Sequence, residues 1–208
     1  MILYSVGRAS HDPFNIFSKV ETAMSPDQLK PGGALLLHGG EDISPSIYNH
    51  KVSNFCHAGD KPSKRDQFEI DMANRAIDLE MPIIGICRGA QLVCALDGGY
   101  LVQHIVGHGY DGHIVINPEN GQRLGKSNTA HHQMMMPRKS KTNLILGIVN
   151  EIITGFEQDD KLRSYEGAIE LVHFKKINAL GIQGHPEWMQ PSDEYVANIA
   201  RYIKEEML

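Results

Sequence analysis

Two short apolar runs indicate buried strands. Residues 34–38 (ALLLH) and 82–86 (PIIGI) carry apolar side chains without polar alternation. Such runs are typical of strands that are covered on both faces in a parallel sheet. Residues 2–6 have the same texture, so we expect them to form a third strand of this kind.

Helical spacing occurs in three segments. Between residues 66 and 80, apolar side chains recur at steps of three and four, which predicts a crossover helix between two strands. Residues 90–96 repeat the pattern, and the Gly-Gly pair that follows favours a helix end. Near the C-terminus, Ser192 is a candidate N-cap for a last helix whose apolar face extends to Ile203.

The second half of the chain has a sequence pattern typical of β-strands. Short segments rich in β-branched residues are separated by Gly, Asn and Asp, which predicts further strands and hairpins. We expect them at 113–117, 144–149, 152–156, 168–173 and 180–183. With the alternation of strands and helices before it, this pattern predicts an α/β fold with a mainly parallel central sheet and added β-hairpins in the C-terminal half.

Composition narrows the class of protein. A length of 208 residues favours one domain, 1–208, and 41% hydrophobic with 22% charged residues excludes a disordered chain. A formal net charge of -5 argues against nucleic acid as a ligand. Three cysteines are too few for a disulfide framework, and neither a basic leader nor a membrane-length apolar stretch occurs. We therefore expect a soluble, cytoplasmic protein without a membrane segment.

The sequence GICRG at residues 85–89 has the form of a nucleophile elbow, in which glycines flank a residue presented above the sheet. Cys87 follows a predicted strand and begins a predicted helix, so the helix N-terminus and Arg88 are both expected to favour its thiolate. The plainer interpretation is a small buried cysteine at a strand end. Cys56 and Cys94 lack this context, which makes Cys87 the candidate nucleophile.

His185 and Glu187 are the candidate base and its orienting group, as a cysteine nucleophile requires. On an extended segment, residues two apart point to the same face. Pro186 between them cannot donate to a central ladder, which places the segment at a strand end, where active sites of open α/β sheets lie. In a chain with 11 histidines, a histidine two residues before a glutamate is by itself weak support for a catalytic base. The elbow at Cys87 strengthens the interpretation, because a cysteine nucleophile needs a base.

Gly39 and Gly40 follow the predicted strand 34–38 and are candidates for an oxyanion hole. Without a Cβ atom, their backbone N–H groups are accessible near the end of the strand. We expect one donor to be the N–H of Gly40 and another to be the N–H of Arg88, the residue after the nucleophile. An ordinary Gly-Gly turn is the alternative interpretation.

The abundance of histidine raises the question of a metal site. The histidines considered for it are His104, His108, His113, His131 and His132. None forms the pair, four residues apart with a helical glutamate, that is typical of zinc proteases, and no cysteine cluster assists. From the sequence we therefore expect neither a metal nor an organic cofactor.

Several motifs together resemble the class I glutamine amidotransferase superfamily and, within it, the γ-glutamyl hydrolase-like branch, peptidase C26. The elbow GICRGAQ at 85–91 is similar to the C-R-G-x-Q of that branch. The resemblance spans residues 33–187. Further similar motifs are GGEDISP at 39–45 with Tyr48, Arg65-Asp66 with Glu69, GGYLVQ at 98–103, NTAHHQ at 128–133 and GIQGHPE at 181–187.

This resemblance implies a flavodoxin-like three-layer sandwich and a cysteine-dependent hydrolase. It implies that Cys87 is the nucleophile, His185 the base and acid, and Glu187 the orienting group. The implied reaction is hydrolysis of a γ-glutamyl amide, either glutamine or a conjugate, through a thioester and without a cofactor. The residues implied to hold the glutamyl group are Gly39, Gln91, Asn128, Thr129 and His131.

One departure from the family pattern and two alternative functions bear on this interpretation. Gly184 stands where the family usually has a bulky aromatic residue, so we expect a hole beside the base. The chain is alternatively a glutaminase subunit that passes ammonia to a separate synthetase. Because no synthetase domain is fused to it, the free-standing hydrolase is favoured. A non-catalytic thiol sensor, in which Cys87 is oxidised rather than acylated, is an alternative of another class.

Overall fold

The chain forms strands in two sheets within residues 1–108 and 111–208, which the computed structural model describes. A smaller sheet pairs β5 (Tyr100–Val102) with β9 (Met134–Met136). The strands of the larger sheet are β1 (Ile2–Val6), β2 (Lys19–Ala23), β3 (Ala34–Leu37), β4 (Ile83–Ile86), β6 (His104–Val106), β7 (His113–Ile116), β8 (Arg123–Ser127), β10 (Asn143–Phe156), β11 (Leu162–Phe174) and β12 (Ala179–Ile182).

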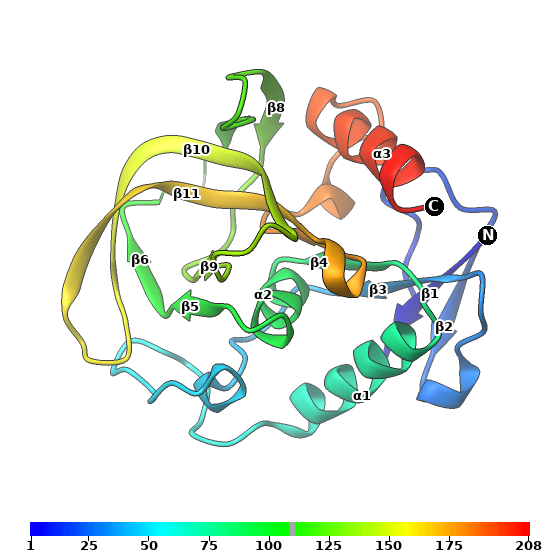
Figure 1. Ribbon diagram of the computed structural model, residues 1–208, viewed down its shortest axis with the longest axis horizontal. Coiled ribbons are helices and arrows are strands. Elements are labelled where there is room, and N and C mark those ends of the chain that lie inside the picture. Colours follow the sequence, from blue (N-terminus) through cyan, green and yellow to red (C-terminus); the bar gives the residue numbers. More distant parts are fainter. Residues whose placement is uncertain (109–110) are drawn as a thin grey trace.

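The larger sheet joins a parallel half to an antiparallel half. Its order is β2-β1-β3-β4-β12-β11-β10-β7-β8, with β6 beside β10. The pairs from β2 to β12 are parallel. The pairs that continue from β12 through β11 and β10 to β8 are antiparallel. In Figure 1 the long strands β10 and β11 arc away from the parallel half.

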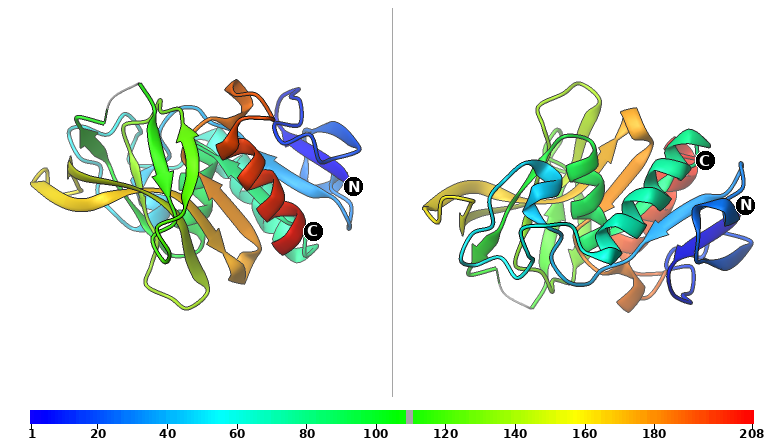
Figure 2. Two further views of the ribbon diagram at one scale, coloured as in Figure 1. Left: turned by 90° about the horizontal axis from the view of Figure 1, so that it is seen from above. Right: turned by 90° about the horizontal axis from the view of Figure 1, so that it is seen from below.

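Helices cover both faces of the parallel half. Figure 2 shows α1 (Lys64–Asp78) and α2 (Arg88–Leu96) on one face and α3 (Glu194–Glu206) on the other. Leu35 packs in the core beside α1 and α2, whereas Leu36 packs in the core beside α3. The unbroken apolar run in β3 is therefore buried on both faces, as predicted. Short 3₁₀ turns lie at Pro26–Gln28, Pro45–Tyr48, Lys175–Ile177 and Pro186–Trp188.

These three layers confirm the predicted α/β sandwich with β-hairpins added in the C-terminal half. The ends of β3, β4 and β12 that carry their C-termini lie side by side, because the three strands are parallel neighbours. Each is followed by one segment of the candidate site. None of the helices in the described residues has the length and apolar character needed to cross a bilayer.

Two predicted strands are one strand in the structure. Residues 144–149 and 152–156 both belong to β10, which continues through a register shift between Val149 and Ile152. A bulge absorbs the break in the pattern without ending the strand. The three-residue strands β5, β6 and β9 carry too little pattern to be predicted.

The last helix begins later than predicted. Its N-cap is Asp193, so the prediction of Ser192 is wrong. The Asp193 N–H donates to the Gln190 carbonyl at 2.9 Å, and the Asp193 carboxylate accepts from the Gln190 N–H at 3.0 Å. This reciprocal turn closes before the first helical residue and moves the helix start beyond Ser192.

Candidate active site

Cys87 lies in a strained turn between β4 and α2. Its φ of 49° and ψ of -106° are uncommon for a residue with a side chain. Gly85 and Gly89 make the turn possible, since a Cβ atom on Gly85 would lie 2.5 Å from the carbonyl carbon of Gly89. A Cβ atom on Gly89 would in turn lie 2.5 Å from the carbonyl oxygen of Leu37 in β3. This is the backbone geometry that a nucleophile elbow requires.

His185 lies beside Cys87, just after the neighbouring strand β12. Its Nδ1 is 2.8 Å from Oε1 of Glu187. Since the carboxylate accepts, Nδ1 carries the proton in the neutral ring and Nε2 keeps its lone pair. A Cβ atom on Gly39 would lie 2.7 Å from His185 Cε1 and 3.4 Å from Cys87 Cβ. The thiol and the imidazole therefore face the same small space, which Gly39 leaves open.

Asn128 and Trp188 hold His185 in place. The Asn128 amide donates to the His185 carbonyl at 2.8 Å, and its oxygen accepts from the His185 N–H at 2.7 Å. The Trp188 indole stacks on the imidazole with ring centroids 3.8 Å apart and planes 2° apart. An aromatic face stabilises a protonated imidazole. Asn128 was expected to contact substrate, but both atoms of its amide bind the backbone of the base.

A cavity of about 300 Å³ connects these groups to solvent. It gives access to the sulfur even though Cys87 is only 6% exposed. A larger cavity of about 430 Å³ between β8 and α3 is lined by neither a cysteine nor a histidine. The residues that line the smaller cavity are Arg8, Gly39, Gly40, Cys87, Ala130, His185, Glu187 and Trp188.

A network of charged side chains links the two predicted oxyanion donors. The Arg65 guanidinium donates to the Gly39 carbonyl at 3.0 Å and pairs with Glu69 at 2.8 Å. Glu69 also pairs with the buried guanidinium of Arg88, at the start of α2. The turn that carries Gly40 and the first residue of α2 are thus fixed relative to one another, which preorganises their backbone N–H groups.

Burial of Cys87 favours its neutral thiol over the thiolate. Burial raises its pKa to about 12, and the negative charge of Glu187 acts in the same direction, whereas the Arg88 N–H opposes both. The Arg88 side chain pairs with Asp66 and Glu69. The Arg88 N–H at the start of α2 does favour the thiolate, but desolvation of the sulfur outweighs it.

We expect alkylation of Cys87 by iodoacetamide to accelerate about tenfold per pH unit from about pH 7 to about pH 10, because only the thiolate reacts. An ordinary thiol levels off above about pH 8.5. Peptide-resolved mass spectrometry gives the rate at Cys87 separately from the other cysteines. A plateau at Cys87 below about pH 9 would show that the site holds a stable thiolate.

Three predicted substrate contacts are not among the residues that line the cavity around Cys87. Gln91 and Thr129 are buried, and the Thr129 hydroxyl has no hydrogen-bond partner among the described residues. His131 is also buried, and its Nε2 faces Glu170 at 3.6 Å. None of the three lines the cavity. Arg8 lines it instead, although no sequence motif points to that residue.

Gly184 does not leave a hole beside the base, contrary to the expectation from the family pattern. The side chain of Ser127 and the backbone of Asn128 close against it, and a Cβ atom would lie 3.0 Å from the Asn128 carbonyl oxygen. The aromatic ring beside His185 comes instead from Trp188, three residues downstream of the base. Glycine is required here because the segment that holds His185 packs against its Cα.

We expect Gly184→Ala to destabilise the protein by about 1–3 kcal/mol, since the added methyl group overpacks the contact with Ser127 and Asn128. Displacement of Asn128 would also lower kcat. Urea unfolding and steady-state kinetics measure the two effects. Gly59→Ala is the matched control, because a Cβ atom at Gly59 meets nothing within 4 Å. Equal stability of the two variants would contradict the packing described here.

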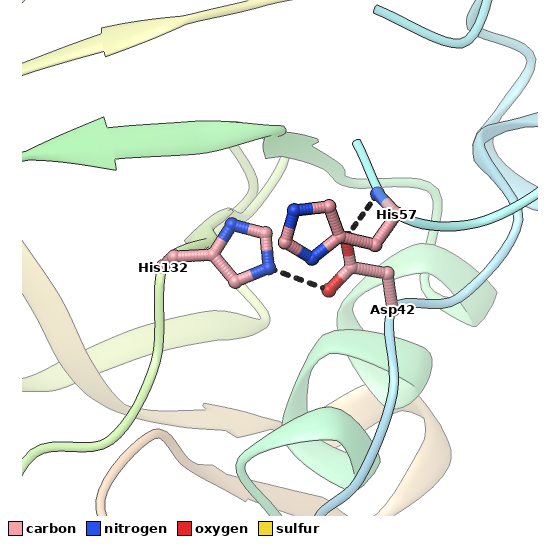
Figure 3. A group of neighbouring side chains, drawn as sticks. All are labelled: Asp42, His57 and His132. Atoms are coloured by element: carbon pink, nitrogen blue, oxygen red, sulfur yellow. Dashed lines mark hydrogen bonds and ion pairs between the residues drawn. The ribbon is translucent and has the colours of Figure 1, made fainter. Parts of the chain in front are cut away.

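Figure 3 shows Asp42, His57 and His132, whose potential ligand atoms all lie within 4.8 Å of one another. The carboxylate is already hydrogen-bonded: Oδ1 lies 2.9 Å from His132 Nε2, and Oδ2 accepts from the His57 N–H at 2.9 Å. These bonds satisfy Asp42 without an ion. The group therefore gives no independent indication of a metal site.

Comparisons with known proteins agree with the fold and the motifs. A glutamine amidotransferase-like protein of Rickettsia prowazekii is 37% identical over 73 residues, a match that covers 35% of this chain and 25% of that protein. A candidate glutamine amidotransferase of Schizosaccharomyces pombe is 27% identical, with 98% of this chain and 85% of that protein covered.

Among solved structures, PurLQS from Thermotoga maritima matches with a TM-score of 0.59 at 14% identity, over 97% of this chain and 98% of that chain. At this identity the likeness concerns the fold alone. The peptidase C26 profile matches residues 2–187, nearly the whole chain. The chain therefore belongs to the peptidase C26 family, within the class I glutamine amidotransferase-like superfamily.

Proposed function

We propose that the protein, acting as one domain over residues 1–208, hydrolyses a γ-glutamyl amide through a thioester on Cys87. One observation carries this proposal: a thiol, an imidazole paired with a carboxylate and a Gly-Gly turn line the same cavity. Each chemical role in acyl transfer to a cysteine then has a group in reach. No metal or organic cofactor takes part in the proposed steps.

In the first half-reaction, the Cys87 sulfur attacks the γ-carbonyl carbon as His185 Nε2 takes the thiol proton. The N–H groups of Gly40 and Arg88 stabilise the negative charge that develops on the carbonyl oxygen. His185 then gives its proton to the amide nitrogen, the C–N bond breaks, and the amine or ammonia leaves. The high pKa of Cys87 makes this proton transfer part of the attack, since no thiolate is present beforehand.

In the second half-reaction, water attacks the thioester carbon and transfers a proton to His185. The C–S bond breaks, the proton returns to the Cys87 sulfur, and glutamate is released. Glu187 keeps the imidazole oriented and stabilises its charged form in both half-reactions, from 2.8 Å. The stacked Trp188 ring acts in the same direction.

Arg8 is the proposed partner of the α-carboxylate of the glutamyl group, because it brings a permanent positive charge to the cavity wall. We expect Arg8→Gln to raise KM about 10- to 100-fold, the cost of about 1.5–3 kcal/mol for a charge-assisted hydrogen bond, with kcat little changed. Arg8→Lys keeps the positive charge, so its KM should fall between that of the native protein and that of Arg8→Gln. An unchanged KM in Arg8→Gln would remove Arg8 from the substrate site.

The exposed Trp188 favours a conjugate over glutamine as the substrate. Its side chain is 65% exposed beside the base that protonates the leaving group, which provides an apolar surface for an amine larger than ammonia. A release assay that compares glutamine with a panel of γ-glutamyl amines tests this preference. Faster turnover of glutamine than of every conjugate would favour a glutaminase that supplies a separate synthetase, and no release at all would favour a thiol sensor.

The proposed location is the cytoplasm. All three cysteines are free. A reducing compartment keeps such thiols available, including the one at the proposed nucleophile.

A further inference from the structure

Three histidines and one glutamate meet inside the protein, apart from the cavity of Cys87. Their side chains are buried, with exposed fractions of 3% for His108, 10% for His113, 1% for His131 and 0% for Glu170. We call these four residues the Glu170 cluster. His113 is on β7 and Glu170 on β11, while His108 follows β6 and His131 precedes β9. Four separate segments thus bring ionisable side chains to one buried point.

The three histidine nitrogens of the Glu170 cluster lie at or just beyond the outer limit of hydrogen-bond distance from the carboxylate. Nε2 of His108, His113 and His131 lies 3.6, 3.4 and 3.6 Å from the same carboxylate oxygen, Oε1 of Glu170. All four of these atoms are buried without a hydrogen-bond partner among the described residues. Buried polar atoms are rarely left so. The three nitrogens thus gather around one buried carboxylate oxygen at ion-pair distance.

The spacing matches the edges of a metal coordination polyhedron. Four donors about 2.0–2.2 Å from a tetrahedral Zn²⁺ ion lie about 3.3–3.6 Å from one another. The three separations from Glu170 Oε1 fall in this range. The ligand atoms of His108, His113 and Glu170 also all lie within 4.8 Å of one another.

The contact between His131 and Glu170 calls for a positive charge at this point. His131 Nδ1 is 2.9 Å from the carbonyl oxygen of Gln133, which only accepts, so Nδ1 carries the hydrogen. In the neutral ring, Nε2 then presents a lone pair to Glu170 Oε1 at 3.6 Å, which is repulsive unless a proton on Nε2 or a nearby cation supplies positive charge.

We propose that the Glu170 cluster binds one Zn²⁺ ion through His108, His113 and Glu170, the three residues whose ligand atoms all lie within 4.8 Å of one another. Imidazole nitrogens with a single carboxylate suit Zn²⁺ better than Mg²⁺ or Ca²⁺, which require mostly oxygen ligands. Three protein ligands would leave the fourth position of a tetrahedral ion to water. The site is independent of the proposed hydrolysis.

The proposed ion would connect the antiparallel half to the strand end that carries His185. The Glu170 carbonyl accepts from the Gln183 N–H at 2.8 Å, two residues before the base. Bound metal would thereby tie the segments of His108 and His113 to this strand pair. We expect Zn²⁺ to raise the midpoint of thermal unfolding, because an ion that binds only the folded state stabilises it.

Chelator-stripped protein titrated with Zn²⁺ against a chromophoric chelator tests the proposal. We expect one equivalent to bind tightly, and Co²⁺ to give the intense visible absorption of a tetrahedral ion. Glu170→Gln and His113→Ala should each weaken binding at least about 100-fold, since loss of an outer-shell partner alone costs about 10- to 100-fold. His57→Ala, in the hydrogen-bonded group of Figure 3, should bind like the native protein.

Three outcomes would overturn the proposal. The first is that the native protein binds no equivalent of Zn²⁺ tightly. The second is that bound Co²⁺ gives the weak spectrum of an octahedral ion. Both are measured on the native protein, so neither depends on whether a variant folds. The third is loss of binding in His57→Ala with retention in Glu170→Gln. Repeating the titration in Cys87→Ala removes the active-site thiol as a competing ligand, and an unchanged stoichiometry separates this site from the proposed reaction.

Discussion

Replacing Cys87 by alanine is expected to reduce turnover of a γ-glutamyl amide by about 10⁴-fold or more, since no other group in the cavity can form the thioester. Alanine keeps the Cβ atom, so the turn between β4 and α2 and its positive φ are retained. The loss should therefore be seen in kcat without loss of the folded state. Circular dichroism and steady-state release of the amine measure the two properties.

Cys56→Ala is the matched control for this variant. The Cys56 thiol is half-buried in the loop near Asp42 and does not line the cavity. We expect Cys56→Ala to retain activity within a few-fold of the native protein. Activity that survives in Cys87→Ala, or that is lost in Cys56→Ala, would place the nucleophile elsewhere.

Replacing His185 by alanine is expected to reduce kcat by about 10³- to 10⁴-fold. The effect should be large because the buried thiol, with its pKa of about 12, needs a base to react near neutral pH. The fold should tolerate the change, since both hydrogen bonds from Asn128 go to the backbone at this position. Single-turnover kinetics should show that formation of the thioester is slowed as well as its hydrolysis.

The exposed residue His11 provides the control for this variant. His11→Ala removes an imidazole at the surface and should leave kcat unchanged. If His185→Ala keeps more than about a tenth of the native kcat, a contribution as general base of about 100-fold or more is excluded.

The parallel half of the sheet and the elbow could be predicted because the residues that define each of them lie close together in the sequence. The apolar runs of β3 and β4 need no partner to be recognised, and the glycines at 85 and 89 lie within five residues of each other. The pairing of His185 with Glu187 is also local. Their position beside Cys87 follows from the neighbouring places of β4 and β12, which the sequence alone does not order.

The features that the sequence does not reveal are contacts between distant segments. Asn128 is bonded to His185 across 57 positions, and the Arg88 side chain turns to α1 rather than to the sulfur next to it. From the sequence, Gly184 predicts a hole beside the base, whereas in the structure the end of β8 packs against it. The Glu170 cluster draws on four segments, so the rule for helical histidine pairs does not detect it.

The most direct test of the account is peptide mapping after incubation with a γ-glutamyl affinity label, such as a diazoketone analogue of glutamine. The account predicts one adduct on Cys87, which forms much more slowly in His185→Ala. An adduct on Cys56 instead, or a labelling rate at Cys87 that is the same with and without the imidazole at position 185, would contradict it.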